Sequence, residues 1–261
     1  MTNIAVLVKQ VPDTYSERKL SESDHTLDRE SADAVLDEIN EKAVEQALQI
    51  KEAGEGEVTA ISMGPDRATD AIRKALSMGA DKAVHISDES LHGTDTVATA
   101  KVLTSAINHI GGVELVIAGN EASDGRGGAI PAMVAELLGL PQVTFAREVS
   151  VDGNNVTAER ETEEGITHLE ANLPAVVSVS EKINEPRYPS FKGIMAAKKK
   201  PVETLSVSDL DIEADAVGLS GAACTVVEAA PKPPRQAGER VNDEGDGGTK
   251  VAEYLVGQKL L

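Results

Sequence analysis

The 261-residue chain contains very few aromatic residues, a single cysteine and no tryptophan. Phe, Trp and Tyr together make up 2% of it, so we expect a core of Val, Leu, Ile and Ala. Cys224 has no partner for an internal disulfide, which favours a reducing compartment such as the cytoplasm. The sequence also lacks an apolar run of about 18 residues and a basic signal-peptide region, so we expect neither a transmembrane helix nor secretion.

Basic residues are scarce as well. The chain has 25 Lys and Arg against 44 Asp and Glu, a formal net charge of −19. Such a balance argues against nucleic acid and against an anionic membrane surface as partners, because both attract basic proteins. The acidity suggests adaptation to a high-salt cytoplasm, where screening weakens self-repulsion, with an ordinary acidic protein as the alternative. A melting temperature that does not change between low and molar salt would contradict adaptation to salt.

The usual catalytic patterns are missing. The five histidines show neither H-x-x-x-H nor Cys/His ligand spacing, which argues against a zinc or haem site. The chain has no G-x-S-x-G, Walker or G-x-G-x-x-G sequence. Cys224 stands in a run of small residues, and we interpret it as a small buried hydrophobic residue. We therefore expect no catalytic residues and no metal ligands.

The order of apolar segments predicts an α/β fold. Short apolar runs alternate with segments of helical spacing, which is typical of βαβ units and a parallel sheet. We expect strands at 4–8, 58–63, 83–86 and 115–118, and helices at 36–53, 66–78, 94–110 and 128–138. The expected architecture is an open, mostly parallel, doubly wound sheet of the Rossmann-like, adenine-nucleotide-binding type.

The pattern changes after residue 140. Runs at 143–151 and 155–161 flank Asp-Gly-Asn, which is hairpin chemistry, and further strands are expected at 166–171 and 175–179. These strands would form an antiparallel extension of the sheet. From about residue 201 the chain is acidic and irregular, with a last helix expected at 251–260. We predict a nucleotide-binding domain at 1–200 and a C-terminal arm at 201–261 that wraps a partner; a loosely ordered tail is the alternative.

A glycine-rich stretch at residues 119–128 follows the fourth expected strand. It lies at the sheet edge where open α/β folds bind ligands. Closely spaced glycines let backbone N–H groups approach a phosphate, and the start of the next helix adds a favourable field. Arg126 would act as a charged clamp, whereas Asp124 would cap the helix or hold a ribose hydroxyl. A flexible strand–helix turn is the alternative interpretation.

A second segment combines aromatic and basic residues. Tyr188 and Phe191 lie among two prolines and Gly193, which oppose regular structure, and several Lys and Arg residues surround them. This pattern is typical of a recognition loop, with Phe191 as the apolar anchor and the lysines steering an acidic partner. The alternative is that both rings fold inward.

The same segment carries a resemblance to a known family. The sequences NEPRYP at 184–189, IM at 194–195 and AKKK at 197–200 resemble the signature of electron transfer flavoprotein β subunits. Similar stretches occur at 8–13, 37–39, 64–68, 75–81, 124–125 and 173–177. The resemblance covers residues 1–200 in unbroken order, and the remaining residues match only in general layout.

The resemblance implies a heterodimer in which a larger α subunit holds most of an FAD. Such a complex accepts electrons from flavin dehydrogenases, often the acyl-CoA dehydrogenases of fatty acid oxidation, and passes them to a quinone oxidoreductase at the membrane. The β subunit would hold a second nucleotide, which is AMP in many relatives and a second FAD in electron-bifurcating ones. The cofactor carries the redox chemistry, so we expect an electron carrier rather than an enzyme, unless the complex bifurcates electrons.

Position by position, the resemblance also assigns residues to three roles. The nucleotide pocket would comprise Leu7, Ala34, Val35, Leu36, Asp37, Met63, Gly119, Asn120, Glu121, Ala122, Ser123, Asp124, Gly125, Arg126, Gly127, Gly128, Ala129 and Ile130. The recognition loop would comprise Ile183, Asn184, Glu185, Pro186, Arg187, Tyr188, Pro189, Ser190, Phe191 and Lys192. Arg160 and Glu161 match a charged pair that helps to orient the flavin domain in relatives.

The chain departs from the family pattern at several of these positions. Ala34 and Val35 stand where the family commonly has Asn-Pro, and Ala129 and Ile130 stand where it has a pair beginning with Gln. The loss of these side-chain donors leaves the affinity and the identity of the nucleotide open. Phe191 replaces the projecting leucine of the family, which suggests a partner pocket of a different shape.

Two other functions remain as alternatives. A regulatory module of the stress-protein type has the same kind of sheet and would use the glycine-rich stretch, but it needs neither the segment at 183–200 nor an α subunit. An enzyme that consumes adenine nucleotides needs catalytic groups that this sequence does not show.

Overall fold

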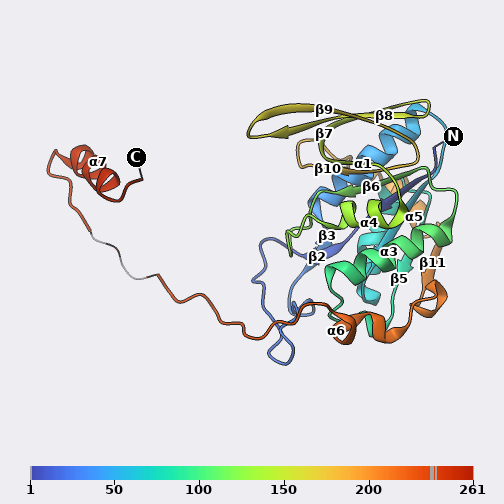
Figure 1. The fold of residues 1–261 in the computed structure, drawn as a ribbon, viewed down its shortest axis with the longest axis horizontal. Helices are drawn as coiled ribbons and strands as arrows, with labels where there is room; N and C mark the ends of the chain where they lie inside the picture. The colour runs from blue at the N-terminus through green and yellow to red at the C-terminus, as the bar shows by residue number, and fades with distance from the viewer. Residues whose placement is uncertain (1, 236–237, 239, 261) are drawn as a thin grey trace. The chain divides into compact units, whose positions relative to one another are not determined.

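The computed structural model describes residues 2–235, 238 and 240–260. The chain divides into two compact units, Met1–Val226 and Val227–Leu261. The first unit contains a large twisted sheet with helices around it (Figure 1), and the second contains the helix α7 (Gly247–Gly257).

Nine strands form the main sheet, in the order β11-β5-β4-β1-β6-β10-β7-β8-β9. The strands from β11 to β7 pair in parallel, and β7, β8 and β9 pair antiparallel. This arrangement confirms the expected α/β fold with an antiparallel extension, which β7, β8 and β9 form. The strand predicted at 175–179 does not belong to that extension, because β10 pairs in parallel between β6 and β7. The bounds are β1 Ile4–Leu7, β4 Val58–Met63, β5 Lys82–Ile86, β6 Leu115–Gly119, β7 Gln142–Asp152, β8 Asn155–Thr162, β9 Gly165–Asn172, β10 Ala175–Val179 and β11 Val202–Leu205.

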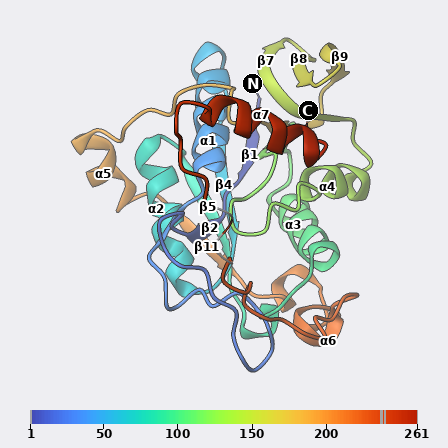
Figure 2. The ribbon, with the colours of Figure 1, turned by 90° about the vertical axis from the view of Figure 1, so that its left-hand side faces the viewer.

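Helices cover both faces of this sheet, as Figure 2 shows. The helices α1 (Glu38–Ala53) and α2 (Thr69–Met78) bury their apolar sides on one face, and α3 (Thr96–Ile110) and α4 (Ile130–Leu138) bury theirs on the other. All buried hydrophobic side chains that the structure describes are Val, Leu, Ile, Ala or Met, which confirms the aliphatic core. The remaining elements are α5 (Phe191–Ala197), α6 (Gly218–Gly221) and the short 3₁₀ turns η1 (Asp66–Ala68), η2 (Glu89–Leu91), η3 (Ser208–Leu210) and η4 (Ala214–Ala216).

The first helix begins two residues later than the apolar spacing predicts. Residues Ala34–Leu36 form the short strand β3, which pairs antiparallel with β2 (Gln10–Pro12). The helix starts at Glu38 because the Asp37 carboxylate accepts hydrogen bonds from the backbone N–H groups of Ile39 and Asn40. The helix predicted from residue 128 likewise begins at Ile130, with a proline in its first turn.

The compact unit extends further along the chain than the division at residue 200 predicts. The strand β11 joins the edge of the sheet beside β5, and Val207, Leu210 and Val217 are buried in the same core as α3. Apolar residues beyond position 200 therefore complete this unit. Cys224 follows α6 outside regular structure and is exposed, so its interpretation as a buried residue is wrong.

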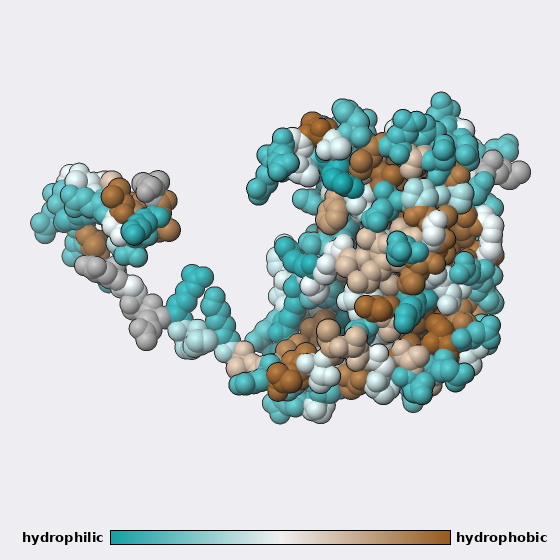
Figure 3. All heavy atoms as spheres, in the orientation of Figure 1, coloured by the Kyte–Doolittle hydropathy of each residue, from teal (hydrophilic) through white to brown (hydrophobic). Residues whose placement is uncertain are grey.

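The second unit is small and has no buried residue in its helix. The helix α7 exposes Val251, Tyr254 and Val256, and Figure 3 shows hydrophobic side chains on its surface. Its bounds lie a few residues earlier than the predicted 251–260. Across the described residues, no helix combines the length and the apolar character that crossing a bilayer requires.

Candidate functional site

The sheet has a topological switch point between β1 and β6. From β1 the chain builds β4 and β5 on one side, and it then returns to place β6 on the other side of β1. Open α/β sheets bind ligands at the carboxyl ends of the strands at such a point. The glycine loop (residues 119–130) runs from the end of β6 to the start of α4, so it leaves the sheet at this position.

The residues expected to bind a nucleotide come from neighbouring strands at this edge. Leu7 ends β1, Met63 ends β4 and Gly119 ends β6, and these three strands lie side by side in the sheet. Ala34, Val35 and Leu36 form β3, whose partner β2 follows β1 closely in the chain; Val35 is the exposed member of β3. The fold thus gathers residues that lie far apart in the sequence.

Asp37 connects the glycine loop to the start of α1. One carboxylate oxygen accepts hydrogen bonds from the first turn of the helix at 3.0 and 3.2 Å, and the other accepts one from the Ser123 N–H at 2.8 Å. Asp37 is almost completely buried. A single carboxylate therefore fixes both the helix start and the path of the loop.

Asp124 connects the same loop to two cations from other segments. Its side chain is 2% exposed and lies 2.9 Å from the Lys9 ammonium and 2.8 Å from the Arg29 guanidinium. Burial raises the pKa of Asp124, but the two cations outweigh burial and hold it below its usual value. Asp124 does not cap α4, whose N-cap is Ala129, so that part of the interpretation is wrong.

Sequence reasoning missed Lys9 and Arg29. Lys9 follows the first strand closely, in a motif that the sequence already singled out, and this position was an available signal. Arg29 lies in the irregular stretch before β3, where no pattern indicates a partner. The ion pairs between distant segments become apparent only in three dimensions.

The glycines of the loop have two different uses. A Cβ atom on Gly119 would lie 2.5 Å from the side-chain amide nitrogen of Asn40, so a larger residue there would displace the Asn40 side chain of α1. Gly125 and Gly127 have open space where a side chain would stand, and they expose the backbone. Arg126 is also exposed, and its guanidinium lies 3.9 Å from the nearest carboxylate, on Glu121.

The loop fits a phosphate-bearing ligand in its chemistry. Asn120 is 9% exposed, and its side-chain oxygen has no hydrogen-bond partner among the described residues. Buried polar atoms normally have a partner, so this amide points to a ligand or a water molecule. The side chains at 34, 35, 129 and 130 offer no donors, and a phosphate would therefore meet mainly backbone N–H groups and Arg126.

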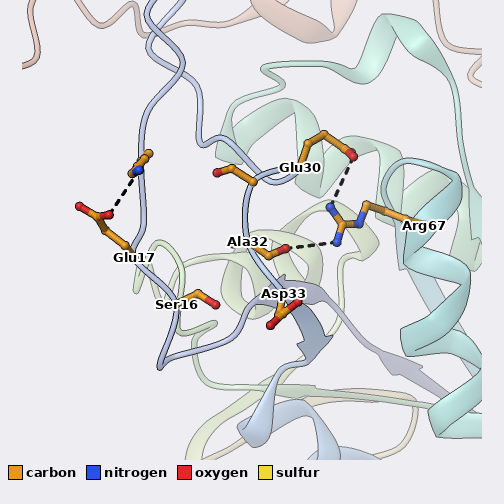
Figure 4. A pocket seen from close by; sticks show the side chains of 8 residues that line it. Ser16, Glu17, Glu30, Ala32, Asp33 and Arg67 are labelled. Carbon is orange, nitrogen blue, oxygen red and sulfur yellow. Dashed lines mark hydrogen bonds and ion pairs between the residues drawn. The ribbon is translucent and has the colours of Figure 1, made fainter.

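A polar cavity of about 400 Å³ lies in the irregular stretch before β3 (Figure 4). Arg67 crosses it from η1, with its guanidinium 3.5 Å from the Glu30 carboxylate and donating a 3.3 Å hydrogen bond to the carbonyl of Ala32. None of the expected nucleotide-binding residues lines it; the lining residues are Ser16, Glu17, Lys19, Glu30, Ser31, Ala32, Asp33 and Arg67.

The recognition segment (residues 183–192) follows β10 and is held against α1. The Arg187 guanidinium donates to the carboxylates of Glu45, at 2.7 Å, and Glu52, at 2.9 Å. These carboxylates raise the pKa of Arg187, and the hydrogen bonds from Arg187 hold the pKa of the buried Glu45 below its usual value, although burial opposes them. The Asn184 amide adds a hydrogen bond to the carbonyl of Lys42. Asn184 and Arg187 therefore brace the segment.

The aromatic rings of this region point outward. Tyr188 is 95% exposed and Phe191 is 80% exposed, so the alternative that both rings fold inward is wrong. Phe191 is the first residue of α5, and the Ser190 hydroxyl caps that helix by accepting from the Gly193 N–H at 3.0 Å. A Cβ on Gly193 would lie 2.5 Å from the Ser77 carbonyl oxygen of α2, so α5 packs closely on α2 and holds Phe191 in place.

The recognition segment also includes residues that are all exposed or half-buried, namely Ile183, Glu185, Pro186, Pro189 and Lys192. Of the lysines behind it, Lys198 and Lys199 are exposed, whereas the Lys200 ammonium donates to carbonyls of Leu76 and Ala80. Lys200 therefore belongs to the scaffold rather than to a steering surface.

Arg160 and Glu161 do not bond to each other. The Arg160 guanidinium donates to the carbonyl and the hydroxyl of Thr144, at 2.7 and 2.9 Å. The Glu161 carboxylate accepts instead from Lys182, at 2.9 Å, and from Arg147. Within residues 2–235, 238 and 240–260, no group of three His, Cys, Asp or Glu side chains could hold a metal ion.

Comparisons with known proteins find similar sequences over the whole length of the chain. The family model for the electron transfer flavoprotein domain matches residues 24–210. The electron transfer flavoprotein subunit β of Mycobacterium tuberculosis is 61% identical over all of both chains, and that of Thermoanaerobacterium thermosaccharolyticum is 40% identical over 91% of each. A subunit of the caffeyl-CoA reductase–Etf complex of Acetobacterium woodii is 34% identical, over 96% of this chain and 94% of its own.

Proposed function

The chain belongs to the family of electron transfer flavoprotein β subunits, and from this premise we propose that it is the smaller half of a heterodimeric electron carrier. In this proposal a larger α subunit holds most of an FAD, and electrons arrive from flavin dehydrogenases such as acyl-CoA dehydrogenases. The complex then delivers them to a quinone oxidoreductase. The cytoplasm is the proposed compartment, because the single cysteine cannot form an internal disulfide.

The exposed ring of Phe191 on a braced helix is the observation that carries this proposal. An apolar side chain contributes most to the binding free energy when it enters a partner's pocket and is already ordered before binding. Arg187, the Ser190 cap and the packing of α5 on α2 supply that order here. A plain nucleotide-binding module has no use for such a feature, which argues against a regulatory protein of the stress type.

We propose the switch point as the site of a second nucleotide, either AMP or FAD. The exposed backbone at Gly125 and Gly127 would receive the phosphate, and Asp37 and Asp124 would hold the loop in place. A bound flavin would supply redox chemistry, whereas AMP would supply none. We therefore propose two candidates for the complex, a simple carrier with AMP at this site and an electron-bifurcating component with a second FAD.

We also propose that the C-terminal arm wraps the α subunit. The exposed Val251, Tyr254 and Val256 of α7 support this idea, because an amphipathic helix without buried residues gains stability only by packing against another surface.

Phe191→Ala tests the recognition role. Loss of an exposed anchor is expected to lower the second-order rate of reduction by a dehydrogenase about 30-fold, which corresponds to an interface hot spot of about 2 kcal/mol. Flavin content should stay unchanged. Leu137→Ala, which removes an exposed apolar side chain from α4, is the matched control. Equal rates for Phe191→Ala and the wild type would contradict the recognition role.

The cofactor proposal is tested by the nucleotides that the purified heterodimer releases on denaturation. One FAD and one AMP for each heterodimer would support a simple carrier, and two FAD would support a bifurcating component. ATP alone, without a retained α subunit, would overturn both in favour of the regulatory module.

A further inference from the structure

Phe145 has a backbone conformation that bulky residues rarely adopt. Its φ is 59°, in the left-handed region where glycine is the usual residue. It lies just before the point where β7 changes from parallel pairing with β10 to antiparallel pairing with β8. The register with β10 shifts between Val143 and Ala146, across Phe145, and the register with β8 shifts between Ala146 and Glu148. Glycine is typical at the left-handed residue of a β-bulge. A phenylalanine here therefore calls for an explanation in terms of its ring.

Burial of the ring in the core does not provide that explanation. Phe145 is 42% exposed, and none of the buried hydrophobic side chains in the described residues is aromatic. The ring is also one of only two phenylalanines in the chain, and the other is the exposed Phe191. Both phenylalanines thus lie at the surface of a protein whose core is aliphatic.

Two sets of hydrogen bonds hold the unusual backbone in place. The Phe145 N–H donates to the hydroxyl of Ser178, a fully buried residue of β10, at 2.9 Å. On the other side, Arg160 of β8 donates to both oxygens of Thr144. A strained backbone conformation persists only where the surrounding contacts enforce it, and such conformations are concentrated at functional sites.

The ring faces the glycine loop. A Cβ atom on Gly128 would stand 3.7 Å from the ring's Cζ and 3.7 Å from the Asn120 carbonyl oxygen, so both groups border the space that a side chain at position 128 would fill. Gly128 has a positive φ of 62°, and α4 begins two residues later at Ile130. The ring therefore lies beside the loop immediately before the helix N-terminus, where backbone N–H groups favour an anion.

We propose that Phe145 is a positioning residue for the phosphate of the nucleotide at the switch point. Its ring supports Gly128 and so sets the path by which the glycine loop enters the first turn of α4. Arg160 and Ser178 act through Phe145, because they hold the backbone that aims the ring. This inference rests on the proposed nucleotide site and adds to it a residue outside the glycine loop.

The test compares binding with stability in the heterodimer. Bound nucleotide is removed, and the dissociation constants of AMP and of FAD are measured together with the Tm of the nucleotide-free complex. Phe145→Gly removes the ring and relieves the backbone strain at position 145. We expect the dissociation constant of the bound nucleotide to rise about tenfold, which is the low end of the effect seen when residues that orient the direct ligands of a metal site are lost. The Tm should not fall, because glycine suits the left-handed backbone.

Three further variants keep the test decisive. Phe145→Tyr retains the ring and should bind within about twofold of the wild type. Ile166→Ala removes an exposed apolar side chain from β9 and serves as the control. Phe145→Asn, which also tolerates a positive φ, replaces the glycine variant if that one does not fold.

The outcomes distinguish the positioning role of Phe145 from the proposed nucleotide site. An unchanged dissociation constant in Phe145→Gly or Phe145→Asn, whether or not the Tm falls, would overturn the positioning role and leave the nucleotide site intact. A wild-type complex that binds neither AMP nor FAD would overturn the proposed nucleotide site, and the positioning role with it.

Discussion

The glycine loop and the recognition segment both leave the same edge of the sheet, after the neighbouring strands β6 and β10. The surfaces that they expose nevertheless differ in chemistry. In the glycine loop the acid belongs to the loop, and Asp124 reaches out to Lys9 and Arg29. In the recognition segment the base belongs to the segment, and Arg187 reaches out to Glu45 and Glu52. Each is braced by ion pairs to other parts of the chain.

The difference lies in what each brace leaves exposed. The glycine loop presents bare backbone at Gly125 and Gly127, which suits an anion that accepts hydrogen bonds. The recognition segment leads into α5 and presents the rings of Tyr188 and Phe191, which suit an apolar pocket. In the proposed roles, a similar electrostatic anchor would serve two kinds of ligand, and the exposed remainder of each loop would select between them.

Removal of the carboxylate at Asp124 is expected to have the largest effect. Asp124→Ala leaves two cations without their partner, and because both are partly exposed we expect a loss smaller than that for a fully buried pair, about 2 kcal/mol. The Tm should fall by about 6 °C. Glu164→Ala, an exposed residue of the β8–β9 turn, is the control. A Tm equal to that of the control would mean that the ion pairs do not hold the loop.

Arg187→Met should release the other brace. The methionine keeps the apolar stem and removes the charge, which leaves the buried Glu45 carboxylate without its cation. We expect the Tm to fall by about 3 °C and the rate of reduction by a dehydrogenase to fall about tenfold, because Phe191 is then no longer preorganised. An unchanged rate with a lowered Tm would show that the brace serves stability alone.

Acid should weaken the anchor of the glycine loop through Asp124. Its pKa is lower in the folded chain than the usual 3.8, so its contribution to stability is complete above that pH and disappears as the pH falls through the folded value. The difference in unfolding free energy between wild type and Asp124→Asn, measured by denaturant titration, should therefore shrink below about pH 4. A difference that is constant down to about pH 2 would contradict the assignment.

Arg126→Ala should have the smallest effect on folding. The side chain is exposed and its nearest carboxylate lies 3.9 Å away, so we expect a Tm within about 1 °C of the wild type. If Arg126 clamps the phosphate, calorimetry should show AMP or FAD binding weakened about fivefold in the same variant. A reduced Tm with unchanged binding would assign Arg126 to the brace instead.

The strand–helix alternation could be predicted because it depends on local apolar spacing. The parallel strands and their helices follow directly from runs such as residues 58–63 and the glycines that end the helices. The three-residue strands β2 and β3 are too short to leave a periodic signal, and they were missed. The strand β11 was assigned to the arm because its acidic surroundings resemble a tail, although its pairing with β5 buries Leu205.

The site could be predicted only where its chemistry is local. The glycine loop and Phe191 are visible in the sequence because glycine spacing and a lone aromatic are themselves the signal. Lys9, Arg29 and the inward turn of Arg187 depend on ion pairs between residues far apart in the chain. Phe145 was missed because its significance lies in a left-handed φ and a register shift, and neither leaves a mark in a sequence.

Cys224 has a practical consequence. It is the only thiol of the chain, it is exposed, and the neighbouring Ala223 N–H is fixed by a 2.7 Å hydrogen bond to Asp95 of the compact unit. It also lies just before the boundary at Val226 between that unit and the arm. A maleimide dye or a nitroxide would therefore attach at one defined place without any engineered mutation. Such a probe would convert the docking of the arm on a partner into a change in fluorescence or in a spin-resonance line shape.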